Sequence, residues 1–241
     1  MRWALAFWLV LFLAGPGVCG FWKGLRDAAS SVATNSTSED GFSGSELEEG
    51  LKEALIVGAK RAVAQVSREG GFLNNPKIRI PLPPHLERVA SVLRRVGYAK
   101  EVEAFEVSMN RAAERAASKA LPIFLKAVKE MTFEDARRIY TGGDHAATDY
   151  FRKKTWDELY GEFRPIVKES MDKVEVTRRY RELFSSPYAR GAASYAGVKS
   201  LEDYVTKKAL DGLFTVLALE EERIRKDPAA RSTELLKKLF R

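Results

Sequence analysis

The segment Thr141–Asp149 holds the residue types needed for acid–base chemistry at the start of a predicted helix. Two glycines lead into the helix N-terminus, where free backbone amides and the helix dipole attract anions. His145 and Asp149 lie one helical turn apart, so the carboxylate could orient the imidazole for proton transfer. The candidate catalytic residues here are His145 and Asp149, and the candidate ligand-binding residues are Gly142, Gly143, Asp144 and His145.

A structural interpretation accounts for most of the same segment. Gly142 and Gly143 are typical of the end of one helix, and Asp144 is a typical N-cap of the next. Only His145 has no role in this interpretation, so the catalytic and structural interpretations both stay open.

Asp211 is the third candidate catalytic residue, because it interrupts the apolar run Ala209–Leu219. A carboxylate inside an apolar helix is costly unless it is paired. An Arg or Lys from a neighbouring helix would make Asp211 part of a structural ion pair, whereas an unpaired Asp211 lining a cavity would be a functional acid.

Metal and cofactor chemistry has little support in this sequence. The chain has two histidines, His85 and His145, which excludes a multi-histidine metal site and the HExxH zinc motif. No glycine-rich phosphate-binding motif of the GxGxxG or GxxxxGK[ST] type occurs. We predict no metal site and no cofactor.

Phe72–Pro84 is the one stretch within the domain that is predicted to be non-helical. Its isoleucines alternate with charged residues, so the backbone should be extended, but its prolines disfavour a regular internal strand. Extended backbone leaves donors free for a ligand, so Asn75 and Arg79 are further candidate ligand-binding residues.

Helical spacing of apolar residues dominates the remaining sequence. Pro84 should open a helix that buries the apolar residues Leu86, Val89, Leu93 and Val96. The sequence predicts an all-α fold, a multi-helix bundle of about six to nine helices with one extended Pro-rich segment.

Several helix boundaries follow from capping residues and prolines. Capping pairs open helices at Thr132, Thr155 and Ser200, and Asp144 caps another. Pro122 should kink or restart a helix before Met131, and Pro165 should interrupt one. The longest internal loop is predicted over Ser185–Lys199, and a terminal helix after Asp227.

The first residues have the pattern of a secretory signal peptide. Arg2 precedes an apolar run, Trp3–Ala14, that fits a signal h-region of about 7–15 residues and is shorter than the ~20 residues a membrane span needs. Small residues at Val18 and Gly20 favour cleavage before Phe21. We predict a signal peptide over 1–20, a flexible leader over 21–45 and a single all-helical domain over 46–241.

Cys19 is the only cysteine, and it lies within the predicted signal peptide. Lipidation at Cys19 is an alternative form of anchoring, although Pro16 fits a lipoprotein signal poorly. Cleavage after Gly20 would leave a mature chain without cysteine, which excludes disulfides and thiol catalysis. We expect an exported protein, periplasmic or secreted.

The chain is basic, with a formal net charge of +7 at pH 7. Removing residues 1–20 takes away only Arg2, so the charge of the mature chain stays close to +6. The basic pairs are spread along the chain, as on solvated helix faces, and they would also attract anionic surfaces. In an exported protein the expected partners are anionic envelope components, lipid or an envelope protein, and no nucleic acid.

Five blocks of sequence resemble the bacterial family catalogued as domain of unknown function 4197. They are Gly71–Pro76 with Ile80–Pro83, Met131–Arg137, Thr141–Phe151, Asp203–Phe214 and Ile224–Arg231. The resemblance runs from about Glu46 to the C-terminus, and it implies an exported helical protein. It implies no activity.

The expected function is therefore that of an exported envelope binding or interaction protein, with a site near Phe72–Pro84 or Gly142–Asp149. One alternative is a hydrolase-type enzyme that uses His145 and Asp149, with Glu134 as a further acid. Another is a peripheral membrane protein that binds through its amphipathic C-terminal helix.

Overall fold

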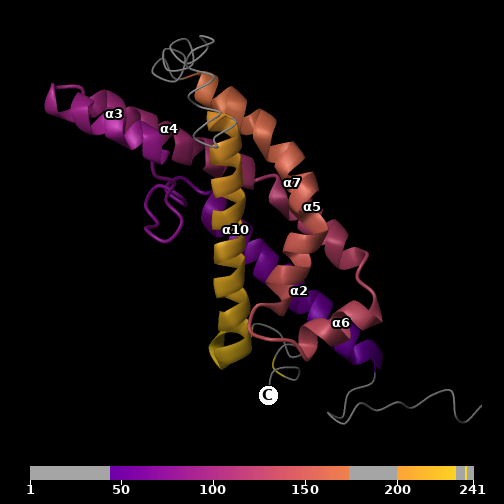
Figure 1. Ribbon diagram of the computed structural model, residues 1–241. Coiled ribbons are helices and arrows are strands. Elements are labelled where there is room, and N and C mark those ends of the chain that lie inside the picture. Colours follow the sequence, from indigo (N-terminus) through magenta and orange to yellow (C-terminus); the bar gives the residue numbers. More distant parts are fainter. Residues whose placement is uncertain (1–43, 174–199, 232–236, 238–241) are drawn as a thin grey trace, which may run out of the picture. The chain divides into compact units, whose positions relative to one another are not determined.

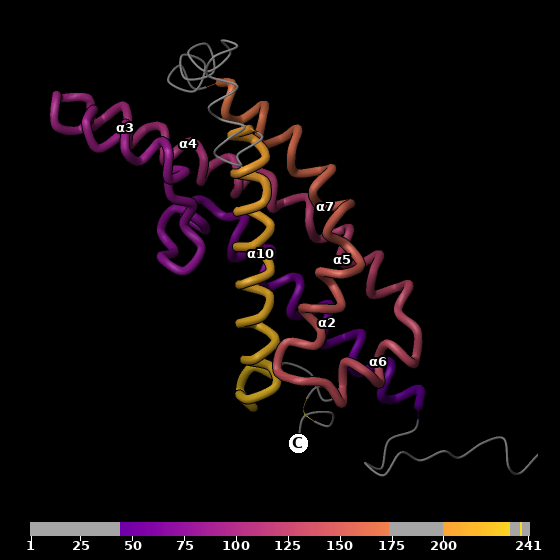
Figure 2. The backbone as a smooth tube through the Cα atoms, viewed as in Figure 1, coloured from indigo at the N-terminus to yellow at the C-terminus, as the bar shows by residue number. Residues whose placement is uncertain are grey.

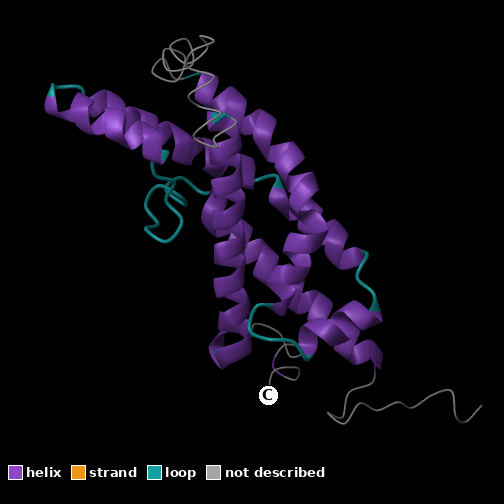
Figure 3. Cartoon of the chain, in the orientation of Figure 1, coloured by secondary structure: helices purple, strands orange, loops and turns teal. Residues whose placement is uncertain are grey.

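The computed structural model describes residues 44–173, 200–231 and 237 (Figure 1). The predicted signal peptide, the leader up to residue 43, the loop Ser185–Lys199 and most of the predicted terminal helix lie outside these residues. The helices are α2 (Gly44–Ser67), α3 (Pro84–Arg95), α4 (Ala99–Ala117), α5 (Ala120–Lys129), α6 (Phe133–Tyr140), α7 (Ala146–Asp172), α10 (Leu201–Lys226) and the short 3-10 helix η1 (Pro228–Ala230). The described residues contain no strand, and the predicted all-α fold is confirmed (Figure 3).

Helix α7 is contacted by α4, α5, α6 and α10, and α10 also packs against α4 (Figures 1 and 2). Aromatic side chains fill the space where α5, α7 and α10 meet. The ring of Phe124 lies 4.8 Å from that of Phe151 and 6.0 Å from that of Phe214. All three are buried, so this aromatic cluster ties the three helices together.

Two of the predicted helix N-termini are confirmed by the structure. Thr132 and Asp135 form a complete capping box at α6, and the hydroxyl of Ser200 accepts from the backbone amide of Asp203 at α10, both as predicted. The predicted start at Thr155 and the predicted interruption at Pro165 are both wrong, because α7 runs without a break from Ala146 to Asp172 and contains Pro165.

The apolar stripe of α3 differs most from expectation. Leu86 and Ala90 are buried, but Val89, Val92, Leu93 and Val96 are 51%, 57%, 37% and 63% exposed. The prediction that Val89, Leu93 and Val96 lie in the core is therefore wrong. Helix α3 packs against α4 (Figure 1), but these four side chains stay at least 37% exposed.

The chain between α2 and α3 is non-helical as predicted (Figure 3). Residues 69–74 and 76–78 form turns, whereas residues 79–83 form none. Phe72 is fully buried in this segment and lies against α10 at Gly212. A Cβ atom at Gly212 would lie 2.5 Å from Cε1 of Phe72 and 3.2 Å from Cβ of Ile78. A glycine is thus required for this close approach.

We expect Gly212→Ala to lower the free energy of unfolding by about 1–3 kcal/mol, because the added methyl group overpacks the contact with Phe72. Gly161 in α7 is the matched control, since a Cβ atom there would meet nothing within 4 Å. Gly161→Ala should raise stability by roughly 0.5–1 kcal/mol through helix propensity. Urea unfolding of both variants checks the pair, and changes of the same sign would contradict the packing.

Candidate functional site

The N-terminus of α7, where an anion was expected to bind, is filled by a carboxylate of the protein itself. Glu221 of α10 accepts from the backbone amides of Ala147 at 2.9 Å and Thr148 at 2.8 Å. It also accepts from the Thr148 hydroxyl at 2.8 Å. Glu221 therefore takes the place of an N-cap side chain, although it lies far away in the sequence.

Arg225 completes this arrangement on the next turn of α10. Its guanidinium group donates to Glu221 at 3.0 and 3.1 Å and to the carbonyl oxygen of Ile139, near the end of α6, at 2.8 Å. The side chains of Glu221 and Arg225 are 8% and 13% exposed. This buried pair joins α6, α7 and α10 and explains why the chain between α6 and α7 turns where it does.

The predicted acid–base residues lie outside this pair. His145, the residue before α7, is exposed, its side chain makes no capping hydrogen bond, and Asp149 is also exposed. Within the described residues, no hydrogen bond or ion pair joins the two side chains. The prediction that Asp144 caps α7 is wrong, because the residue at the N-cap position is His145. Asp144 pairs with Lys226 at 2.7 Å, and hydrogen bonding to Lys226 lowers the pKa of Asp144.

The two glycines before α7 differ in their surroundings. A Cβ atom at Gly142 would lie 2.6 Å from the Cβ of Ala146 and 2.7 Å from the carbonyl oxygen of Arg138. A Cβ atom at Gly143 would meet nothing within 4 Å. Gly142 is therefore needed for the close turn, and the geometry supplies no comparable reason for Gly143.

A cavity of about 30 Å³ lies beside Glu221, between α2, α7 and α10. Apolar side chains, among them Leu55, Phe151 and Ile224, line most of it. This volume suits a water molecule or two and is too small for an organic substrate.

Asp211 lies on the exposed side of α10, and its side chain is 52% exposed. It pairs with Arg152 of α7 at 3.3 Å, which is the structural ion pair that the sequence predicted as one of two alternatives. The Arg152 guanidinium also lies 4.6 Å from the ring centroid of Phe214. Asp211 therefore helps to hold a cation over the aromatic cluster.

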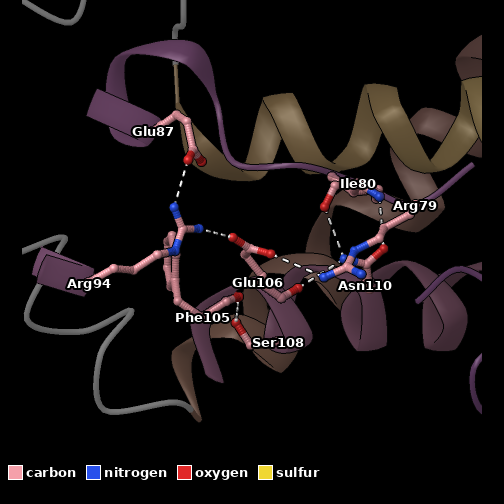
Figure 4. Close-up of polar contacts among 8 residues, drawn as sticks. All are labelled: Arg79, Ile80, Glu87, Arg94, Phe105, Glu106, Ser108 and Asn110. Atoms are coloured by element: carbon pink, nitrogen blue, oxygen red, sulfur yellow. Dashed lines mark hydrogen bonds and ion pairs between the residues drawn. The ribbon is translucent and has the colours of Figure 1, made fainter. Parts of the chain in front are cut away.

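A row of polar side chains on α4, here called the polar ladder, holds the non-helical segment and was not predicted from the sequence. Its members are Glu106, Asn110 and Glu114, spaced four residues apart (Figure 4 shows the first two). The amide group of buried Asn110 accepts from the Ile80 backbone amide at 2.8 Å and donates to the Ile80 carbonyl at 3.0 Å. Asn110 thus pairs with the extended backbone as a neighbouring strand would.

Glu114 holds the other end of the segment. Its carboxylate accepts from the backbone amides of Phe72 and Leu73 at 3.0 and 3.1 Å and pairs with Arg111 at 2.7 Å. Because Glu114 is almost fully buried, these bonds fix the turn that places Phe72 against α10.

The two candidate ligand-binding residues of this segment are engaged within the protein. The side chain of Asn75 accepts from the backbone amide of Lys77 at 3.1 Å, and Arg79 pairs with Glu106 at 3.2 Å. Asn75 also lines an open cleft of about 490 Å³ at the end of α2. The structure does not bring Asn75 and Arg79 together with the Gly142–His145 turn in one site.

Ion pairs of Arg94 help to hold helix α3 on α4. Arg94 pairs with Glu87 of its own helix at 2.6 Å and with Glu106 of the ladder, and Arg79 reaches the same Glu106 (Figure 4). Hydrogen bonding to Glu87 raises the pKa of Arg94. The polar residues of α3 therefore contribute to the contact with the rest of the protein, while most of its apolar residues face away.

We call Val89, Val92, Leu93, Val96 and Tyr98 the α3 face. Tyr98, 53% exposed, follows Gly97, whose φ of 101° ends the helix. Arg88 and Arg95 border this face, each within four residues of Val92, and both are exposed. The α3 face is thus an apolar strip with a basic margin.

Three further features of the described residues concern metal binding, membrane spanning and a surface groove. They contain no group of three or more His, Cys, Asp or Glu side chains placed to hold a metal ion. Within the same ranges, no helix combines the length and apolar character needed to cross a bilayer. A groove of about 560 Å³ lies between α4 and α7, and its lining combines basic residues with Glu103 and apolar ones; the basic residues are Lys100, Arg111, Arg115 and Lys173, and the apolar ones are Ala104 and Val107.

Comparison with known proteins identifies the family. The chain belongs to the family described as "Protein of unknown function (DUF4197)", whose model matches residues 23–241. The resemblance seen in the five sequence blocks is confirmed, and the match begins before Glu46. No curated protein and no solved structure shows detectable similarity to this chain. Membership of the family assigns no activity, so function is inferred from the geometry.

Proposed function

We propose that this chain is an exported helical protein of the bacterial envelope that acts by docking to a partner, and that α3 is its docking element. The α3 face carries this proposal. Four apolar side chains between 37% and 63% exposed, at helical spacing on a single helix, form the kind of contiguous apolar surface that soluble proteins use for binding.

The arrangement of α3 supports docking, because the helix is fixed before any partner binds. The contacts of Arg94 with Glu87 and Glu106 and the burial of Leu86 and Ala90 hold it against α4. A surface fixed in this way loses little conformational freedom on binding, which favours affinity.

The sequence of residues 1–20 supports export. In this proposal the signal is cleaved before Phe21, Cys19 leaves with it, and the mature protein is periplasmic or secreted. The basic charge of the mature chain then faces the anionic components of the envelope.

The two alternatives have less support. An acid–base enzyme would need His145 and Asp149 in a shared cleft, and both are exposed without a bond between their side chains. A membrane anchor formed by the C-terminal helix concerns residues that lie mostly outside the described ones.

Site-specific photo-cross-linking in living bacteria tests the proposal. We expect a cross-linking residue at Val92 to form an adduct with a second molecule, and the same residue at Leu219 of α10 to form none. Leu219 is a suitable control because it is an apolar helix residue that is 36% exposed and lies outside the α3 face. Mass spectrometry of the same material should show a chain that begins at Phe21. An uncleaved chain in the cytoplasm would contradict export.

A further inference from the structure

We propose that the partner of the α3 face is an anionic lipid bilayer, into whose headgroup region the face inserts. This inference rests on the proposed docking function and names the partner. Three observations carry it: the outward direction of the apolar side of α3, the basic residues along its margin, and the small extent of the surface.

Helix α3 turns most of its apolar residues outward, and the polar contacts of Arg94 attach it to α4 together with the burial of Leu86 and Ala90. Val92 and Val96 are the most exposed of its apolar residues, at 57% and 63%, whereas Arg94 is held by Glu106 of α4. Figure 4 shows Arg94 between Glu87 and Glu106. An amphipathic helix that lies in a bilayer interface presents such an apolar side to the acyl chains.

The margin of the face supplies charge complementarity to anionic headgroups. Arg88 and Arg95 lie four residues before and three residues after Val92, on the same side of the helix. Lys100, which also lines the groove between α4 and α7, follows at the start of α4, and all three side chains are exposed. Among the described residues, none of these three side chains has an ion-pair partner. Their long side chains can reach phosphate groups while the valines insert more deeply.

Tyr98 fits the same location. It is 53% exposed at the tip of the α3–α4 hairpin, directly after Gly97. Tyrosine is enriched at the boundary between headgroups and acyl chains, because its ring is apolar and its hydroxyl group is polar.

The extent of the surface favours a bilayer over a second protein. A stable protein interface takes roughly 20–30 residues from each side. The α3 face consists of five residues on one short helix and its tip. A bilayer needs no matching shape, so a narrow apolar strip with a basic margin suffices for reversible attachment.

Vesicle flotation of the chain over residues 21–241 tests the inference. Vesicles of phosphatidylethanolamine with phosphatidylglycerol should carry the protein, and vesicles of phosphatidylcholine alone should carry much less. We expect Val92→Asp combined with Val96→Asp to lower binding to the anionic vesicles roughly tenfold or more, because two charges would enter the interface.

The matched control is Phe133→Asp combined with Leu219→Asp. These residues are 41% and 36% exposed, so the control removes two exposed apolar side chains and adds the same charge elsewhere. It should bind nearly as well as the parent. Equal loss in both double variants, or no loss in either, would overturn the inference, and circular dichroism confirms that each variant is folded.

A second measurement leaves the α3 face almost intact. Residues 21–241 contain no cysteine, so Val96→Cys and Leu219→Cys each create a single labelling site. A polarity-sensitive dye should shift to the blue on anionic vesicles at position 96 and stay unchanged at 219. A shift at 219 alone, or at neither position, would overturn insertion through α3.

The outcomes separate the inference from the proposed function. An adduct with a protein at Val92 in cells, without vesicle binding, would overturn the bilayer and leave docking intact. A dimer that dissociates in the Val92→Asp, Val96→Asp variant, again without vesicle binding, would assign the face to a second copy of the chain. A cytoplasmic, uncleaved chain would overturn the proposed function even if vesicles bind.

Discussion

Glu221→Ala should lower the free energy of unfolding by about 4 kcal/mol, the largest effect we expect from a single substitution. The change removes the acceptor of two backbone amides at the start of α7 and leaves the nearly buried guanidinium group of Arg225 without its carboxylate. Breaking one partner of a buried ion pair typically costs about 3–5 kcal/mol.

Thermal unfolding followed by circular dichroism measures this effect, and the midpoint should fall by about 10 °C for a domain of this size. Glu221→Gln keeps an acceptor for one amide, so its loss should be roughly half as large. The adjacent Glu222 is the control, because its side chain is 42% exposed and pairs with Lys226 on the surface. Glu222→Gln should change stability by less than about 0.5 kcal/mol. Equal effects at 221 and 222 would rule out Glu221 as the cap of α7.

Asn110→Leu should lower the free energy of unfolding by about 3 kcal/mol. Leucine has a similar volume but cannot bond to the backbone of Ile80, which is 1% exposed, so one buried amide and one buried carbonyl would lose their partners. The extended segment should detach from α4, and α3, which follows this segment, should lose part of its support.

Urea unfolding gives the stability change, and hydrogen exchange at the Ile80 amide gives its location. Ser118→Ala after the end of α4 is the control, because Ser118 is exposed and bonds only to its own helix. Its change should stay within about 0.5 kcal/mol. Unchanged protection of the Ile80 amide in Asn110→Leu would contradict the pairing.

Sequence patterns predicted the helices and their local caps better than the contacts between residues that are distant in the chain. The fold class, the capping box at Thr132 and the N-cap at Ser200 were predictable, because each depends on residues close together in the chain. The cap of α7 was not predictable, because its acceptor, Glu221, lies more than seventy residues away in the chain. Local turn chemistry pointed to Asp144, which pairs with Lys226 instead.

The α3 face shows the same limit in another form. Apolar periodicity correctly predicted a helix with one apolar side, but it cannot show whether a neighbouring helix covers that side. The polar ladder of α4 was missed because Asn110 and Glu114 lie within a run of apolar and alanine residues that predicted a buried helix face. Their partners are backbone groups about 30 and 42 residues earlier in the chain, which no spacing within α4 reveals.

Cross-linking from position 92 in living cells is the most direct measurement of the central claim, that α3 is the element through which this protein docks. We expect an adduct at Val92 in the envelope fraction that is absent at Leu219 and lost in the presence of Val96→Asp. Adducts of equal yield at both positions, or none at Val92 in a chain that is exported and folded, would contradict it.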